Sequence, residues 1–292
     1  MTPSTYLLVV LSAITHAYWN FLLKRSRNGQ IIVGLSKLVE AAMLAPFLMI
    51  GYAASPVRLA DTWILPFVGA ILVLINYVAL AAAYRRAELS VVYPISRGGM
   101  LLFLPPLAFL TIGERLSVLG WTALTLIVAG IAMLQIPSFS LASLVRFGGE
   151  IHSTATAYAL LAAFVAACYT VWDKRAIQVL SPLTYFAAYT VILGIVYAFV
   201  LPLMTRAQTL SKVWRGEWKI ITQIAALNIG SYLLALIALQ TGQASYVIAL
   251  RQLSIAVGAM LGWRLLGESF PQPRRAGVGL VVLGCVLLGL TR

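Results

Sequence analysis

The sequence is poor in charged residues, and the shortage is greatest for acidic side chains. Only 10% of its 292 residues are charged, and 8 Asp and Glu stand against 21 Lys and Arg. A soluble domain carries about 25% charged residues, so the chain lacks the polar surface that a soluble protein needs. Hydrophobic residues make up 61% of it. This composition predicts an all-α integral membrane protein.

Cysteine and histidine are also scarce, which limits the chemistry that the chain can perform. Cys168 and Cys285 both lie in apolar segments, and neither a disulfide nor a thiol metal site is expected there. His16 and His152 lie in different surroundings and do not suggest a metal site. There is no Gly-x-Ser-x-Gly, no His-Glu-x-x-His and no glycine-rich phosphate loop. We therefore expect no enzyme activity, no metal and no cofactor.

The net charge of +13 does not indicate a nucleic-acid partner. The basic residues cluster in short loops between apolar segments, which is typical of loops held at an anionic cytoplasmic membrane face. No basic domain is left to bind a nucleic acid. The first apolar segment is followed, not preceded, by basic residues, so we expect a retained helix and not a cleaved signal peptide. The lipid bilayer is the expected surrounding.

Ten segments are long and apolar enough to span a bilayer, which needs roughly 20 residues per helix. One set of alternate loops holds 13 Lys and Arg and the other set with the tails holds 5, while Lys37, Arg97 and Arg251 lie within spans. The positive-inside rule then places both termini outside the cytoplasm of an inner membrane. The expected spans are residues 4–23, 31–51, 63–84, 90–111, 117–134, 156–176, 183–203, 219–239, 244–266 and 274–290.

The two halves of the chain resemble each other at a nearly constant offset. Glu114 and Glu268 are 154 residues apart, Tyr77 and Tyr232 are 155 apart, and the tryptophans at 19 and 172 are 153 apart. This indicates a five-helix repeat over residues 1–136 and a second one over 156–292, joined by a linker at 137–155. Five is odd, so the second repeat is inverted, as in many transporters that bind substrate between their halves.

Three paired motifs carry a resemblance to a known family. Each repeat has Trp19-Asn20 or Trp172-Asp173 late in its first helix. Each fourth helix has a serine four residues before Pro94 or Ala249, and ends in Gly-Glu. The chain resembles the drug/metabolite transporter superfamily, and within it the EamA-like ten-helix exporters that include amino-acid exporters.

The resemblance implies a basket of ten helices around a central cavity, alternating access and export. Two features depart from the family pattern. Ala249 replaces the proline of the first repeat, so we expect the two fourth helices to bend differently. Many family members keep both termini in the cytoplasm, whereas the charge distribution here favours the outside.

Two arginines stand within predicted spans, and the first follows Pro94 in the stretch SVVYPISRGGM of residues 90–100. A charge at the centre of a span costs at least about 2.5–3.5 kcal/mol unless it is paired or hydrated. We predict that Arg97 and Arg251 line the cavity and hold a substrate carboxylate through paired hydrogen bonds. The structural alternative is that they cap carbonyls freed near the proline and the glycines.

Aromatic and polar residues complete the predicted site. Trp19, Trp172, Tyr77 and Tyr232 form repeat-related pairs that inverted symmetry would bring to one cavity, and Tyr93 lies beside Arg97. Aromatic walls favour apolar and aromatic ligands, although membrane proteins also place aromatic belts at the interface. Tyr18, Tyr169 and Tyr246 belong to the same predicted set.

His16 and Asn20 are four residues apart and so lie on one face of the first helix, which we predict to line the cavity. With Asn76, Asn228, Gln240 and Gln252 they would hydrogen-bond a zwitterion, and His16 is a group that would couple transport to protons. The alternative, which the sequence supports equally, is that these residues form hydrogen bonds between helices.

Lys37 and Glu40 are three residues apart on one helix face, where we expect an ion pair; the alternative is a role in binding a substrate or an ion. Asp173 is expected to pair with its neighbour Lys174.

The combined prediction is a secondary transporter of the inner membrane that exports small metabolites, above all aromatic or apolar amino acids, by alternating access. Two alternatives stay open. The first is a transporter of another substrate class, such as a nucleotide sugar, a lipid-linked sugar or a cationic drug. The second is a membrane scaffold that transports nothing, in which the intramembrane polar residues would pair off and leave no cavity.

Overall fold

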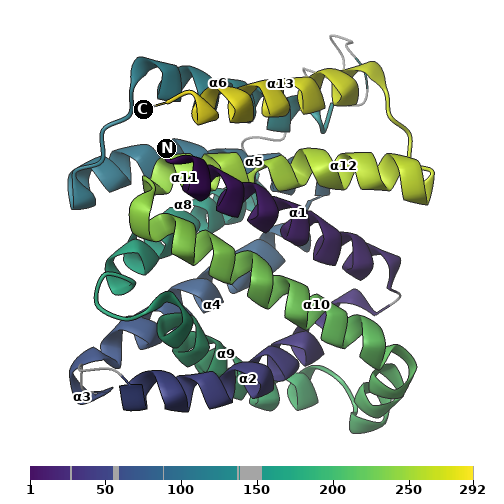
Figure 1. The fold of residues 1–292 in the computed structure, drawn as a ribbon. Helices are drawn as coiled ribbons and strands as arrows, with labels where there is room; N and C mark the ends of the chain where they lie inside the picture. The colour runs from purple at the N-terminus through teal and green to yellow at the C-terminus, as the bar shows by residue number, and fades with distance from the viewer. Residues whose placement is uncertain (27, 55–58, 88, 137, 139–152, 292) are drawn as a thin grey trace.

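The protein is described here by a computed structural model that covers residues 1–26, 28–54, 59–87, 89–136, 138 and 153–291, and these residues form helices without strands (Figure 1). The fourth predicted span forms one continuous helix, Leu89–Ile112, and its counterpart at 244–266 is broken into two. The first repeat contains α1 (Pro3–Arg25), α2 (Gly29–Ala54), the one-turn α3 (Leu59–Thr62), α4 (Ile64–Tyr84), α5 (Leu89–Ile112) and α6 (Val118–Met133). The second contains α8 (Thr154–Ala176), α9 (Pro182–Met204), α10 (Ala207–Thr241), α11 (Ala244–Arg251), α12 (Leu253–Leu266) and α13 (Gln272–Gly289).

Every predicted span coincides with a helix, so the ten-helix plan is confirmed. Eight segments of the described chain are long and apolar enough to cross a membrane, with α11 and α12 counted as one. The other two are α6, which is apolar but short, and α13, which contains Arg274 and Arg275 in its first turn. Most of the 137–155 linker lies outside the described residues.

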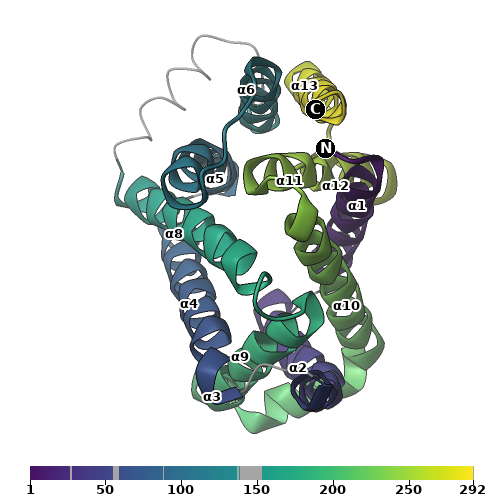
Figure 2. The same cartoon turned by 60° about the vertical axis from the view of Figure 1, so that its left-hand side comes forward.

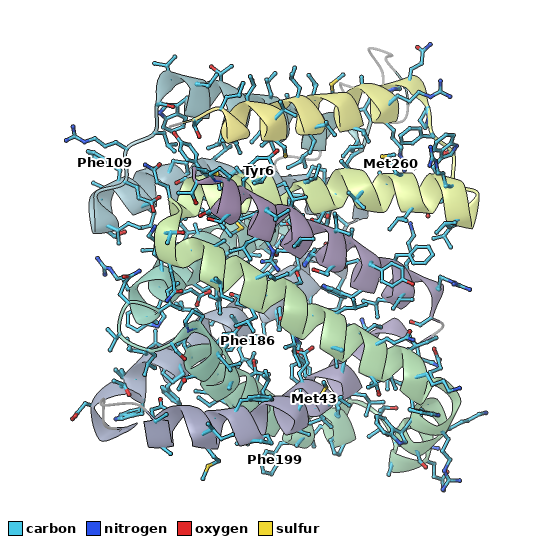
Figure 3. The ribbon with its side chains drawn as sticks, viewed as in Figure 1. Tyr6, Met43, Phe109, Phe186, Phe199 and Met260 are labelled. Carbon is cyan, nitrogen blue, oxygen red and sulfur yellow. The ribbon has the colours of Figure 1, made fainter. Side chains whose placement is uncertain are left out.

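The outer surface of the molecule is apolar, as a surface in contact with lipid tails must be. Leu203 is 86% exposed and Leu110 is 78% exposed. Phe109 and Phe199 point away from the helices, whereas Phe186 lies among them (Figure 3). The polar side chains that line the cavities described below lie inside the bundle.

The contacts between helices recur when the two repeats are exchanged. α1 packs against α10, and its repeat equivalent α8 packs against α4, the equivalent of α10. α2 packs against its own equivalent α9, and α6 packs against its own equivalent α13. The last pair forms a separate layer beside α5 and α11–α12, while the remaining helices surround the interior (Figure 2). This pattern is that of two inverted repeats related by a pseudo-two-fold axis.

Small residues allow the closest of these contacts. A Cβ atom on Gly130 would lie 2.7 Å from the carbonyl oxygen of Gly277, and one on Gly277 would lie 2.7 Å from the carbonyl oxygen of Gly130. Glycine at both positions lets the backbones of α6 and α13 meet, which is the usual way that membrane helices pack tightly.

The two fourth helices differ, as expected, but the break does not fall at the proline. α5 is continuous through Pro94, whereas the second repeat is interrupted at Gln252. The side-chain Nε2 of Gln252 donates to the carbonyl oxygen of Ile248 at 3.1 Å, and its backbone N donates to Ala249 instead. The side chain thus occupies the Ile248 carbonyl, which the backbone amide of Gln252 would use in a regular α-helix, and the local turn tightens.

Candidate functional site

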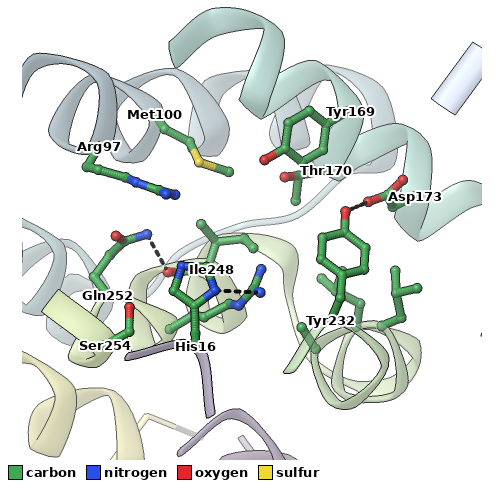
Figure 4. Close-up of a pocket in the computed structure, with 14 residues that line it drawn as sticks. His16, Arg97, Met100, Tyr169, Thr170, Asp173, Tyr232, Ile248, Gln252 and Ser254 are labelled. Atoms are coloured by element: carbon green, nitrogen blue, oxygen red, sulfur yellow. Dashed lines mark hydrogen bonds between the residues drawn. The ribbon is translucent and has the colours of Figure 1, made fainter. Parts of the chain in front are cut away.

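Two adjoining cavities lie between the repeats, and the smaller one is drawn in Figure 4. The larger has a volume of about 210 Å³ and the smaller about 30 Å³. Both are formed by α1, α5, α8, α10 and α11, so the site is made by both repeats. The residues that line both cavities are His16, Arg97, Met100, Tyr169, Tyr232 and Arg251.

The cavities point toward opposite ends of the helices. We call the end where the N-terminus donates to the Thr291 carbonyl the terminal end, and the end with Lys24, Arg85 and Arg86 the basic end. The larger cavity is lined by Trp19, late in α1, and Val33, early in α2, and so extends toward the basic end. The smaller one is lined by Asp173 and Leu239, late in α8 and α10, and by Ile248 in α11, and so extends toward the terminal end.

Arg97 and Arg251 lie in the shared wall of the two cavities. The Nη2 of Arg251 is 3.2 Å from the Ser231 hydroxyl and 3.4 Å from His16 Nδ1, and its guanidinium lies 5.3 Å from the centre of the Tyr232 ring. Arg97 lies 5.8 Å from the Tyr93 ring centre. Within the described part of the chain, neither guanidinium forms an ion pair with a carboxylate. No carboxylate of the described residues therefore neutralises either charge by an ion pair.

Lys37 and Glu40 form the ion pair that their spacing predicts. The Lys37 Nζ lies 2.8 Å from one carboxylate oxygen of Glu40 and 3.1 Å from the other, and both residues are buried. Asn228 on α10 donates to the same carboxylate at 3.1 Å. The pair lines the larger cavity but contributes no net charge to it.

Asp173 does not pair with Lys174, and that prediction is wrong. Consecutive residues point to different sides of a helix, and here the two side chains turn apart. Asp173 accepts hydrogen bonds from the hydroxyls of Tyr185 and Tyr232, each at 2.6 Å, and is almost fully buried. Figure 4 shows the bond from Tyr232. Lys174 instead lies 2.9 Å from Glu114.

The lining residues leave the cavity with an excess of positive charge. The Lys37–Glu40 pair is neutral, and Asp173 offsets only one of the two arginines. Opposite charges attract strongly where water is scarce. A ligand that carries a carboxylate or another anionic group is therefore favoured over a cation.

The predicted aromatic wall is only partly present. Trp19, Tyr77, Tyr169 and Tyr232 line the cavities. Trp172 does not, because its Nε1 donates to the Leu65 carbonyl of α4 at 2.8 Å. The structure thus brings both tyrosines of the predicted pairs to the larger cavity, but only one of the two tryptophans.

Three other aromatic residues of the predicted set lie outside the cavity lining. Tyr93 contacts Arg97 without lining either cavity. Tyr18 is 46% exposed on the outer surface. The Tyr246 hydroxyl accepts a hydrogen bond from the Ser117 amide at 3.0 Å.

Among the polar residues, His16, Asn76, Asn228 and Gln252 line a cavity, and Asn20 does not. Asn20 is exposed and donates to the carbonyl of His16 in its own helix at 2.7 Å. The structure adds lining residues that we did not predict: Ser96, Met100, Thr170 and Ser254. Met100 follows from helix geometry, because it lies three residues after Arg97 and so on the same helix face.

Comparison with known proteins agrees with this architecture. Residues 153–290 match the model of the EamA-like transporter family. A search of curated proteins finds no match. A solved structure described as "Crystal structure of protein" is similar over 99% of this chain and 98% of that chain, with a TM-score of 0.74 and 16% sequence identity. At this identity the likeness supports the fold alone.

Proposed function

We propose that the chain, whose residues 153–290 match the model of the EamA-like transporter family, is a membrane transporter of that family and exports amino acids with aromatic or apolar side chains. The substrate would cross the inner membrane by alternating access through the cavity between the repeats. The observation that carries the proposal is the pair of cavity arginines without a carboxylate partner in the described chain. They would hold the substrate carboxylate, and Trp19, Tyr77 and Tyr232 would contact its side chain.

The size of the cavity supports a small substrate. Its volume of about 210 Å³ is below the range of about 300–1,000 Å³ that is usual for drug-sized ligands. A nucleotide sugar or a lipid-linked sugar would need more room, and a cationic drug would meet the excess positive charge. In a scaffold without transport, carboxylates would neutralise the intramembrane arginines, but no ion pair does so among the residues that the structure describes.

Uptake into proteoliposomes against a panel of radiolabelled amino acids tests this function. We expect uptake of aromatic and apolar amino acids, and we expect Arg97→Ala and Arg251→Ala to weaken it. A charge-assisted hydrogen bond contributes about 1.5–3 kcal/mol, which corresponds to roughly a 10- to 150-fold higher KM for each variant.

Arg85→Ala is the matched control, because Arg85 is an exposed arginine outside the cavity. Its KM should equal that of the unchanged protein. Failure to transport any amino acid would refute the substrate class, and a normal KM in both cavity variants would remove the arginines from the site. A pH gradient imposed on the same vesicles tests whether protons are coupled to transport.

The distribution of basic residues also leads us to propose an orientation, with the basic end in the cytoplasm and both termini outside. Lys24, Arg85 and Arg264 belong to this end, which carries 13 of the 21 basic residues of the sequence. Basic loops are retained on the cytoplasmic side during insertion. The larger cavity would then open toward the cytoplasm in this structure.

A further inference from the structure

The carboxylate of Asp173 is buried at the smaller cavity without an ion-pair partner. The side chain lines that cavity, the residue is 1% exposed, and no ion pair reaches it among the residues that the structure describes. The hydroxyls of Tyr185 and Tyr232 each donate to a different oxygen, which leaves about half of the acceptor sites of a carboxylate unused. Buried charges are normally paired, so Asp173 can still accept a cationic group.

The smaller cavity has opposite charges on its two sides. Arg97 lies on one side of the drawn cavity and Asp173 on the other (Figure 4). Tyr232 stands between Asp173 and Arg251, because its hydroxyl donates to the carboxylate at 2.6 Å and its ring centre lies 5.3 Å from the guanidinium. The aromatic ring thus keeps cation and anion near each other but apart.

This arrangement is complementary to a zwitterion. In an α-amino acid the carboxylate and the ammonium group are attached to the same carbon atom. They therefore need partners of opposite charge that lie close together and do not neutralise each other. A ligand with an anionic group alone would satisfy the arginines and leave Asp173 unpaired, and a ligand with a cationic group alone would do the reverse.

The size of the smaller cavity fits an amino group. Its volume of about 30 Å³ is enough for a group of the size of a water molecule, which needs about 10–15 Å³. Thr170 also lines it, one helical turn before Asp173. The Thr170 hydroxyl donates to the Ala166 carbonyl at 2.9 Å, and its oxygen can still accept a hydrogen bond. An ammonium group would find acceptors in both side chains.

We propose that Asp173 binds the α-ammonium group of the substrate, with Thr170 as a second acceptor. Arg97 and Arg251, in the wall that both cavities share, hold the carboxylate, and the substrate side chain extends into the larger cavity beside Trp19. This inference rests on the amino-acid transport proposed above. It narrows the substrates to zwitterions, so that the same acid without its amino group is bound poorly.

Two ligands that differ only in the amino group test this subsite on the unchanged protein. Uptake of radiolabelled phenylalanine into proteoliposomes is inhibited with unlabelled phenylalanine or with hydrocinnamate, which is phenylalanine without its amino group. We expect hydrocinnamate to inhibit about 10- to 150-fold more weakly, which is the effect of losing one charge-assisted hydrogen bond. Where leucine is the better substrate, isocaproate is the matching analogue.

Two variants assign this difference to the subsite. Asp173→Asn should raise the KM for phenylalanine about 10- to 150-fold. The inhibition constant of hydrocinnamate should stay the same or fall, because a negative charge near its carboxylate is removed. Thr170→Val, which keeps the shape of the side chain, should raise the KM for phenylalanine about 2- to 10-fold and leave hydrocinnamate unaffected.

Tyr185→Phe is the matched control, because it removes a hydrogen bond from the same carboxylate but lies outside both cavities. The ratio of the constants for hydrocinnamate and phenylalanine should equal that of the unchanged protein. A general loss of structure would weaken both ligands alike, whereas loss of the ammonium subsite weakens phenylalanine alone.

Hydrocinnamate that inhibits the unchanged protein as well as phenylalanine does would overturn the subsite and leave amino-acid transport intact. An equal rise of both constants in Asp173→Asn would overturn it too. Where Asp173→Asn fails to fold, Thr170→Val takes its place, and an unaltered KM for phenylalanine would overturn the proposal. No uptake of any amino acid would refute the proposed function and the subsite with it.

Discussion

Lys37→Met should strongly destabilise the protein, because it leaves the Glu40 carboxylate buried without its cation. Glu40 is 1% exposed and accepts two hydrogen bonds from Lys37 Nζ, at 2.8 and 3.1 Å. After the substitution only the Asn228 amide remains as a partner. Breaking a buried ion pair on one side costs about 3–5 kcal/mol, which is a large part of the about 5–15 kcal/mol that holds a typical protein folded.

The double variant Lys37→Met with Glu40→Gln separates the lost pair from the lost side chain. Glutamine has no charge to bury and still offers an oxygen to Asn228. Replacing both members of a buried pair is often nearly neutral, so we expect the double variant to recover most of the lost stability. The free energy of unfolding is measured by chemical denaturation in detergent micelles. Lys212→Met, at an exposed lysine, is the control.

Two outcomes would refute this reasoning. One is a Lys37→Met protein within about 1 kcal/mol of the unchanged protein, which would show that water in the cavity replaces the ammonium group. The other is a double variant that is less stable than Lys37→Met alone.

Transport by the stable double variant then decides between the two roles of the pair. Normal uptake means that the pair is structural, and lost uptake means that it belongs to the substrate site.

Three further predictions concern packing, the buried carboxylate and orientation. Gly277→Ala places a Cβ 2.7 Å from a carbonyl oxygen of α6 and should lower the unfolding free energy by about 1–3 kcal/mol. Gly279→Ala is the control, because its Cβ would have no atom within 4 Å. Equal melting temperatures for the two variants would contradict the close approach of the helices. Asp173→Ala leaves two tyrosine hydroxyls without an acceptor and should cost about 1–3 kcal/mol for each buried group; an unchanged chemical denaturation curve would refute this. Thr2→Cys should react with a membrane-impermeant maleimide in intact spheroplasts, and labelling only after permeabilisation would reverse the orientation.

The helices could be predicted because their signal is local. A run of roughly 20 apolar residues has few alternatives in a bilayer, and all ten predicted spans coincide with helices. The break at Gln252 could not be read in the same way. It depends on which carbonyl one amide side chain selects, and Pro94 in the first repeat suggested a different place.

The cavity arginines could also be predicted, since an unpaired charge inside a membrane has few tolerable surroundings other than a cavity. The environment of Asp173 could not. Its partners Tyr185 and Tyr232 come from α9 and α10, 12 and 59 residues further along the chain. Its sequence neighbour Lys174 was a plausible partner only until the direction of each side chain was known.

The error on the tryptophan pair has a different origin. The repeats are alike in sequence, and symmetry predicts one environment for Trp19 and Trp172, yet one lines the cavity and the other is hydrogen-bonded away from it. Tyr77 and Tyr232 do not differ in this way, because both line the larger cavity. If each repeat can adopt both arrangements, the sequence encodes two related structures of similar free energy, and no local pattern tells which end is closed. The alternating access that we propose would need this near balance, since a few kcal/mol of differential binding must be enough to exchange the two states.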